Sequence, residues 1–263
     1  MLLTIDLGNT NLTIGLYDGE TLTNHWRLST DSTRMPDEYG LQLLGLMNNA
    51  DRTHEDLTGI CLSSVVPQLT GRVIQACREH LNQEPLVVDT GVKTGIRIRY
   101  EDPKAVGADR VCDAVAVMHL YGGPACIIDF GTATTFNALT KEGDYLGGAI
   151  TAGINLAAEA LFAHGAKLQR IDLQKPPSVI GRNTTHAMQS GLIYGYVAMT
   201  EGMVARFREE LGADMKVVAT GGLAALIAKE TPVIQIHAPW LTLDGLRLIW
   251  EMNPVKPAQE IRS

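Results

Sequence analysis

The sequence has few cysteines, few aromatic residues and no long apolar run. Its 263 residues include four cysteines with no Cys-x-x-Cys pair, so we expect reduced, buried thiols and no disulfide framework. No apolar stretch approaches the roughly 20 residues that a membrane-spanning helix requires. The N-terminal residues lack a basic leader and reach Asp6 too early for a signal peptide. These absences predict a cytoplasmic protein that does not act at a membrane.

Positive charge is also scarce. The chain has 22 Lys and Arg residues and 29 Asp and Glu residues, which gives a formal net charge of −7. Nucleic-acid binding relies on clustered basic side chains, so no nucleic-acid partner is expected. A nucleotide remains compatible, because backbone amides and a metal ion can hold a triphosphate without a basic surface. The sequence contains no P-loop, Gly-x-Ser-x-Gly or HExxH pattern, which argues against a P-loop NTPase, an α/β-hydrolase and a zinc enzyme.

Two segments of the chain share one pattern. LLTIDLGNTNLTIGLYDG starts at Leu2 and CIIDFGTATTFNALTKEG starts at Cys126. Each reads as an apolar strand ending in Asp-x-Gly, small polar residues, and a second strand closed by a glycine turn. Asp6 and Asp129 thus occupy equivalent places. The repeat predicts an α/β protein of two duplicated domains, residues 1–115 and 116–263, with a nucleotide in the cleft between them.

Hydrophobic periodicity and turn residues place the remaining elements. The halves alternate strand and helix, and two short helices are expected at the C-terminal end. The predicted helices are Asp37 to Met47, Gln68 to Leu81, Asp109 to Leu120, Ile154 to Ala163 and about Thr185 to Leu211; the predicted strands are Ile60 to Val66, Leu86 to Asp89, Gly95 to Tyr100 and Lys216 to Ala219.

The first hairpin turn has the composition of a phosphate site. Gly8 permits a tight turn, and Asn9, Thr10 and Asn11 offer amides and side chains to phosphate oxygens. Asp6 can hold Mg²⁺ directly or through water, since a carboxylate beside phosphates requires an intervening cation. An ordinary glycine hairpin is the alternative.

The second hairpin offers the same chemistry again, with Asp129 followed by the hydroxyls of Thr132, Thr134 and Thr135. A Thr-rich strand is the alternative. Two further glycine-rich segments each allow two interpretations. Residues 217–222 are expected to form a strand-to-helix turn, which either lets a ligand approach closely or has no ligand role. Residues 147–153 are either a ligand-facing loop or a tightly packed segment.

The segment Gly107-Ala108-Asp109-Arg110 begins a predicted helix. Asp109 can accept the proton of an attacking hydroxyl, and Arg110 can bind an anionic substrate group or developing phosphate charge. The alternative is an N-cap aspartate beside a surface arginine. Asp113, one turn later, is expected to be solvated rather than to orient a neighbouring group.

Taken together, these motifs resemble the superfamily of actin, the large heat-shock chaperones and the sugar kinases. The ordered set DLGNTN, GADR, DFGTATT, GGAITAGI and ATGG resembles one compact family in it, the type III pantothenate kinases. The resemblance spans nearly the whole chain. It implies an actin-like (ribonuclease H-like) fold, a homodimer whose substrate site is completed near the interface, and a monovalent cation, K⁺ or NH₄⁺. The apolar face of the helix around Ile193 to Val204 suits such an interface.

The resemblance also implies roles for individual residues. Asp109 would be the general base, Asp6 would serve Mg²⁺-ATP, and Asp129 would bind the monovalent cation. Some relatives carry a lysine where this chain has Thr13, so neutralisation of the phosphates would depend more on metal and amides. The remaining implied contacts are Gly8, Asn9, Thr10, Asn11, Thr13 and Thr132 with ATP, and Tyr100, Gly107, Ala108, Arg110 and Thr184 with pantothenate.

The resulting expectation is transfer of the ATP γ-phosphate to pantothenate, giving 4'-phosphopantothenate, the first step of coenzyme A synthesis in the family. A nucleotide-dependent accessory or regulatory protein is the main alternative, because some relatives are named as factors in gene regulation. A phosphatase of the same superfamily is a third reading. A pure binding protein would need neither a base nor an anion contact at Asp109 and Arg110.

Overall fold

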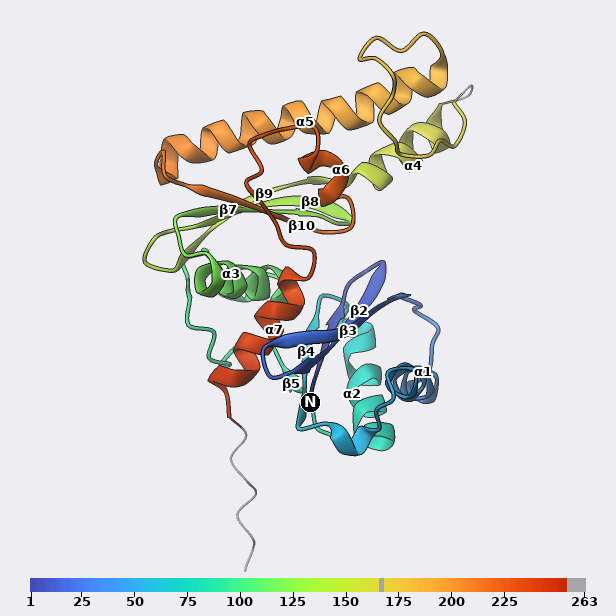
Figure 1. Ribbon diagram of the computed structural model, residues 1–263, viewed down its shortest axis with the longest axis vertical. Coiled ribbons are helices and arrows are strands. Elements are labelled where there is room, and N and C mark those ends of the chain that lie inside the picture. The colour runs from blue at the N-terminus through green and yellow to red at the C-terminus, as the bar shows by residue number, and fades with distance from the viewer. Residues whose placement is uncertain (166–167, 255–263) are drawn as a thin grey trace, which may run out of the picture. The chain divides into compact units, whose positions relative to one another are not determined.

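The computed structural model describes residues 1–165 and 168–254, which form two compact units (Figure 1). Unit 1 comprises residues 1–95, 104–115 and 242–254, and unit 2 comprises residues 96–103 and 116–241. No helix in the described part of the chain combines the length and the apolar character needed to cross a membrane. All four cysteines are buried and free, as predicted from the sequence.

Unit 1 is built on a five-stranded sheet in the order β3-β2-β1-β4-β5. β1, β2 and β3 form an antiparallel meander, while β4 and β5 continue the sheet parallel to β1. The strands span Leu2–Leu7 (β1), Asn11–Asp18 (β2), Thr21–Ser29 (β3), Gly59–Ser64 (β4) and Leu86–Val87 (β5).

Unit 2 repeats this order. Its six-stranded sheet runs β11-β10-β7-β8-β9-β6, with an antiparallel meander β7, β8, β9, parallel strands β10 and β11 beyond β7, and β6 added beside β9. The strands span Arg97–Ile98 (β6), Ala125–Phe130 (β7), Ala133–Leu139 (β8), Asp144–Ala152 (β9), Lys216–Thr220 (β10) and Ile236–His237 (β11).

The two sheets match residue by residue where the sequence predicted equivalence. Asp6 is the penultimate residue of β1 and pairs with Thr13 on β2 and Ser63 on β4. Asp129 is the penultimate residue of β7 and pairs with Thr135 on β8 and with β10. The predicted fold class of two duplicated actin-like α/β domains is therefore confirmed.

One face of the unit 1 sheet is covered by α1 (Pro36–Asn49) and α2 (Pro67–Leu81). Alternate residues of β1, such as Ile5, pack there against side chains of both helices. A 3₁₀ turn, His54–Asp56, and a second one, Pro103–Ala105, complete the short helical elements. Alternate residues of β1 reach α1 and α2 because every second side chain of a strand points to the same face of the sheet.

The opposite face of that sheet meets the first part of α3 (Ala108–Leu120) and α7 (Leu241–Met252). Tyr17 Oη donates to Asp244 Oδ1 at 2.7 Å, and Gly59 leaves room for the Trp250 ring. Because both faces are covered, β1 is buried along almost its whole length. Asp6 lies on this second face, in register with Ser63.

In unit 2, α4 (Ile154–His164), α5 (Thr184–Leu211) and α6 (Ala224–Ala228) pack on one face of the sheet (Figure 1). Phe130 and Val204 belong to the resulting core. Since Phe130 points to the helices, the neighbouring Asp129 points to the other face. Asn183 caps α5 by accepting from the His186 amide at 2.8 Å, which explains why the helix begins where its periodicity predicts.

The compact units depart from the predicted continuous halves in two places. The predicted halves are residues 1–115 and 116–263, whereas residues 96–103 belong to unit 2 and residues 242–254 to unit 1. The reason is pairing and packing distant in sequence: β6 joins β9, and α7 covers the unit 1 sheet through contacts such as Tyr17 with Asp244.

Asp113 corrects another expectation. The sequence predicts a solvated side chain, yet Asp113 is only 2% exposed and accepts a hydrogen bond from Thr242 Oγ1 at 2.7 Å. The bond joins α3 to α7 and compensates a carboxylate that would otherwise be costly to bury.

Replacing Thr242 with valine removes this donor at nearly constant volume. We expect the free energy of unfolding in urea to fall by roughly 1–3 kcal/mol, because the buried carboxylate loses a partner. The same change at Thr21, which is exposed on β3, should alter it by less than about 0.5 kcal/mol. Equal effects of the two changes would mean that the Thr242 bond contributes nothing to the packing of α7.

Candidate functional site

The first hairpin turn of unit 1 has a fixed backbone and an exposed tip. Gly8 N donates to Asn11 O at 2.9 Å, and Thr30 Oγ1 donates to Gly8 O at 2.7 Å. Asn9, Thr10 and Asn11 are exposed at the tip. A turn held in this way presents its polar groups to a ligand with little loss of conformational entropy.

Asp6 sits just inside that turn, half-buried among hydroxyl groups. Thr13 and Ser63 share its face of the sheet, from β2 and β4. Ser63 Oγ is fully buried and makes no hydrogen bond within the described chain. A carboxylate beside hydroxyl oxygens is a donor set that suits Mg²⁺, so the residues present fit the expected metal.

Ser63 is a candidate residue that the sequence motifs did not indicate. It follows the unremarkable run GICL, and no Asp-x-Gly turn stands beside it. Only its register opposite Asp6, on the next parallel strand, brings it to the site. Aligning the ends of parallel strands is the signal that would have found it, because ligands bind beyond those ends in open α/β sheets.

The GADR segment forms the first turn of α3. Val111 N donates to Gly107 O at 3.2 Å, so the helix begins at Ala108 and Asp109 lies within the first turn rather than at the N-cap. A Cβ at Gly107 would lie 2.5 Å from Asp109 Oδ1. Glycine is therefore needed for the Asp109 carboxylate to fold back over the start of the helix.

Burial raises the pKa of the Asp109 carboxyl above its ordinary value. The Arg110 amide, which donates to Asp109 Oδ1 at 2.8 Å, and the Arg110 charge both oppose that rise. A partly desolvated carboxylate is a stronger base than a solvated one, which is the property that proton abstraction from an alcohol requires.

Asp6 and Asp109 belong to one electrostatic neighbourhood. Cys112, fully buried on α3, has a pKa raised by desolvation and further by the charges of Cys61, Asp6, Asp113 and Asp109. The expected metal ligand and the expected base of unit 1 thus both act on the pKa of the same buried thiol.

Asp129 occupies the corresponding place in unit 2, enclosed by glycines. A Cβ at Gly131 would lie 3.1 Å from Asp129 Oδ2, and one at Gly221 would overlap Asp129 Oδ1. Gly221 also has φ +92°, a conformation that favours glycine. Gly221 therefore makes room for the Asp129 carboxylate in this structure. The sequence suggests either close approach of a ligand or a routine turn at this segment.

The face that carries Asp129 is lined with oxygen atoms. Tyr145 Oη donates to Asn137 Oδ1 at 2.8 Å, and Asn137 Nδ2 donates to Thr135 Oγ1 at 3.1 Å. Thr132, in the turn, is exposed and accepts at its carbonyl from Gly153 N at 3.0 Å. A carboxylate among hydroxyl and carbonyl oxygens fits a hard cation such as K⁺.

The glycine-rich residues 147–153 form part of strand β9 and its end. A Cβ at Gly148 would overlap the carbonyl oxygen of Phe136 on β8, and one at Gly147 would lie 3.0 Å from the Tyr100 ring. These two glycines thus pack closely against their neighbours, and they also line a cavity of about 230 Å³, so both predicted roles stay open for this segment.

The two remaining expected substrate contacts lie apart within unit 2. Tyr100 packs on β9 and is 37% exposed. Thr184 begins α5 and lines an open groove of about 780 Å³ with Leu161, Arg182 and Met188, among others. Tyr100 is not among the described residues that line this groove, so unit 2 by itself does not bring the two together.

Comparison with known proteins adds an independent line of evidence. A model of the family described as type III pantothenate kinase matches residues 2–206. The chain belongs to the type III pantothenate kinase family. It is 49% identical over 253 residues to the type III pantothenate kinase of Moorella thermoacetica, covering 96% of this chain and 100% of that protein. A second such kinase, from Geobacillus kaustophilus, is 46% identical over 256 residues, with 97% and 99% covered.

Two solved structures share the fold at low sequence identity to this member of the pantothenate kinase family. A Campylobacter jejuni protein described as a Baf family transcriptional activator superposes with a TM-score of 0.62 at 18% identity, over 95% of this chain and 97% of the other. The ethanolamine utilization protein EutJ of Carboxydothermus hydrogenoformans superposes with a TM-score of 0.54 at 13% identity, over 94% and 89%. At these identities the likeness shows the fold alone.

Proposed function

We propose that this protein transfers the γ-phosphate of ATP to the primary hydroxyl of pantothenate, giving 4'-phosphopantothenate, the first step of coenzyme A synthesis. Membership in the type III pantothenate kinase family supports the reaction. The observation in the chain itself that carries the proposal is Asp109, a partly buried carboxylate of raised pKa at the start of α3. ATP and a divalent metal ion are the cofactors of such a reaction.

Asp109 is the proposed general base. As the pantothenate hydroxyl attacks the γ-phosphorus, its proton passes to the Asp109 carboxylate, and the bond to the departing ADP breaks. Arg110 is the proposed contact for the pantothenate carboxylate or for charge on the transferring phosphoryl group. Gly107 and Ala108 hold Asp109 in place and contact the substrate.

Asp6 is the proposed Mg²⁺ ligand, directly or through water. When bound there, Mg²⁺ would supply positive charge that offsets the negative charge of the phosphates during transfer. Thr13, on the same face of the sheet, carries no charge, so the phosphates depend on this metal and on hydrogen bonds. Gly8, Asn9, Thr10, Asn11 and Thr132 are the proposed hydrogen-bonding contacts for ATP.

Asp129 is the proposed ligand of a monovalent cation, K⁺ or NH₄⁺. Its carboxylate is enclosed by Gly131 and Gly221 and faces Thr135. The bound cation would hold the second hairpin, and with it Thr132, in position for the nucleotide.

A homodimer completes the proposal. Tyr100 and Thr184 are proposed to contact pantothenate, and unit 2 of one chain does not place both at one groove. The apolar face of α5 that the sequence suggests for the interface, around Ile193 to Val204, is buried within unit 2. A second copy would instead pack on the exposed apolar side chains beside the groove and supply the remaining contact. The exposed apolar residues near the groove, Leu156, Leu161, Phe162, Val179 and Ile180, are surface that such a dimer would cover.

A coupled assay of ATP consumption tests the reaction. We expect consumption to require pantothenate, and to fall when K⁺ is replaced by Na⁺ at constant ionic strength. ATP consumption that is indifferent to pantothenate would contradict the kinase assignment and favour a phosphatase. ATP binding without turnover would favour a nucleotide-dependent regulatory protein. Pantothenate-dependent turnover that is indifferent to K⁺ would refute only the cation role of Asp129.

A further inference from the structure

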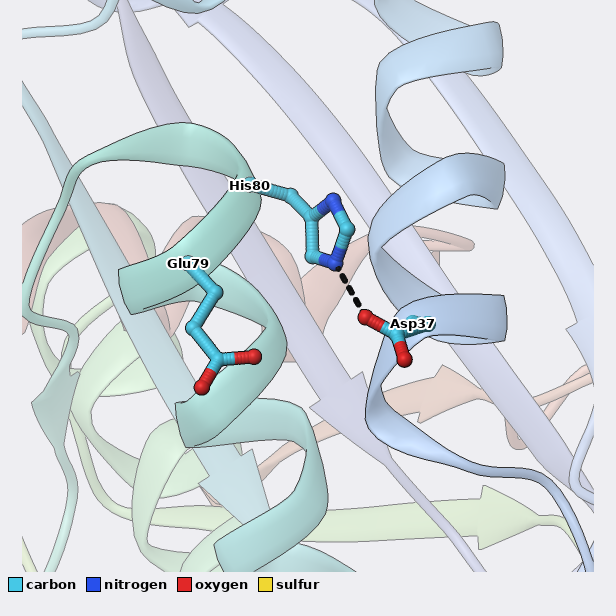
Figure 2. Close-up of side chains that lie close together, drawn as sticks. All are labelled: Asp37, Glu79 and His80. Carbon is cyan, nitrogen blue, oxygen red and sulfur yellow. Dashed lines mark hydrogen bonds and ion pairs between the residues drawn. The ribbon is translucent and has the colours of Figure 1, made fainter.

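Three side chains with metal-binding atoms meet on unit 1, where the first turn of α1 lies beside the last turn of α2. Figure 2 shows Asp37 on α1 facing His80 and Glu79 on α2. One ligand atom from each of the three lies within 4.8 Å of the other two, and His80 Nε2 lies 2.9 Å from Asp37 Oδ1. We propose that this cluster binds a divalent transition-metal ion such as Zn²⁺, which would join α1 to α2.

The position of the His80 ring is determined by Gly40. A Cβ at Gly40 would overlap Cδ2 and Cγ of the ring and lie 2.9 Å from the His80 Cβ. Glycine inside a helix costs roughly 1 kcal/mol relative to alanine, and here it lets the imidazole lie directly against α1. The His80 side chain is 22% exposed, whereas Asp37 is 77% exposed. The imidazole is thus held in place and the carboxylate is free to adjust.

Glu79 is oriented by a neighbour on its own helix. Gln75, one turn earlier, donates from Nε2 to Glu79 Oε1 at 3.0 Å. Hydrogen-bonded partners of this kind commonly orient metal-binding carboxylates. The nearest basic residue in sequence, Arg78, pairs with Glu84 instead. The two carboxylates carry negative charge that a divalent cation would balance.

The ligand types select the class of metal. Zinc bonds of about 2.0–2.2 Å to nitrogen and oxygen place tetrahedral ligand atoms roughly 3.3–3.5 Å apart. The exposed Glu79 and Asp37 side chains would reach this spacing by small rotations, and water would fill the fourth position. Mg²⁺ prefers oxygen ligands throughout, so His80 favours Zn²⁺, Ni²⁺ or Co²⁺ over the ion that accompanies ATP.

The test is a titration of the full-length, metal-free protein with Zn²⁺ by calorimetry, in excess Mg²⁺, with Co²⁺ absorption as a second probe of the ligands. We expect one saturable Zn²⁺ per chain. His80→Asn should abolish that binding, and Glu79→Gln and Asp37→Asn should each weaken it by about tenfold or more. Zn²⁺ should raise the unfolding temperature of the parent by roughly a few degrees and leave that of H80N unchanged.

A matched control is the double change His54→Asn and Glu55→Gln. These residues are also an adjacent histidine and glutamate on unit 1, but no third ligand is grouped with them among the described residues. The double variant should bind Zn²⁺ as the parent does. Absence of saturable Zn²⁺ binding, or equal binding by the parent and H80N, would overturn the proposal and leave the Asp37–His80 contact as an ion pair between helices.

Discussion

Asp109→Asn is expected to lower kcat by roughly 10²- to 10⁴-fold, the usual contribution of a general base. The amide keeps the size of the side chain and accepts hydrogen bonds, but it cannot take up the proton of the attacking alcohol. Steady-state kinetics with saturating ATP and pantothenate measure the effect. Asp18→Asn, which removes an exposed carboxylate at the end of β2, should leave kcat unchanged.

Stability should move in the opposite direction in the same variant. The pKa of Asp109 is raised in the folded protein, so above the ordinary aspartate pKa the folded state binds the proton more tightly than the unfolded state does. Burial of the charged form therefore costs free energy at neutral pH. Removing the charge should leave the free energy of unfolding in urea unchanged or raise it, a common trade-off at active sites.

The pH dependence of the parent enzyme gives a further check on Asp109. The base acts when deprotonated, so kcat/KM should fall as pH decreases through its pKa, and the raised value places this limb above that of an ordinary aspartate. Near-parental turnover by D109N would show that another group accepts the proton. The same conclusion would follow if D109N kept residual activity and its kcat/KM fell with decreasing pH as that of the parent does.

Gly221→Ala is expected to be the most damaging single methyl addition near the cation site. The residue has φ +92°, and its new Cβ would overlap Asp129 Oδ1 and lie 2.7 Å from Phe130 N. Backbone strain and overpacking together should lower the free energy of unfolding by roughly 2–5 kcal/mol. Displacement of the Asp129 carboxylate should also raise the K⁺ concentration needed for half-maximal activity.

Gly71→Ala is the matched control for that change. Gly71 lies on α2, and a Cβ at this position would meet no other atom within 4 Å, so alanine should stabilise the helix by up to about 1 kcal/mol. Urea unfolding and activity as a function of K⁺ distinguish the two variants. If G221A matched the parent in both measurements, the enclosure of Asp129 by glycine would have no role in stability or in cation binding.

The repeated hairpin was predictable because its pattern is local. An apolar strand, an Asp-x-Gly turn and a second strand are encoded within about twenty residues, and both copies form as predicted. The long helix was predicted as Thr185 to Leu211 and observed as Thr184–Leu211, since its Asn183 cap lies next to it in sequence. Family membership, inferred from the order of these motifs, is confirmed by the comparisons.

Burial of Asp113 was not predictable in this way. Its partner, Thr242, lies 129 residues later in the chain, and helical periodicity alone cannot distinguish a solvated carboxylate from one covered by another helix. Ser63 was missed for the same reason, because only strand register places it opposite Asp6. The role of the β9 glycines was ambiguous in the sequence, because it depends on how closely the backbone of β8 approaches them.

The sequence by itself determined the duplicated architecture, the family and the candidate chemistry of Asp6, Asp109 and Asp129, because strand alternation, turn glycines and carboxylate motifs are encoded in neighbouring residues. Tertiary structure alone decided which carboxylates are buried, which glycines admit a side chain, and that His80 meets Asp37 across two helices. Those outcomes depend on residues far apart in the chain, whose contacts form only when sheets and helices pack.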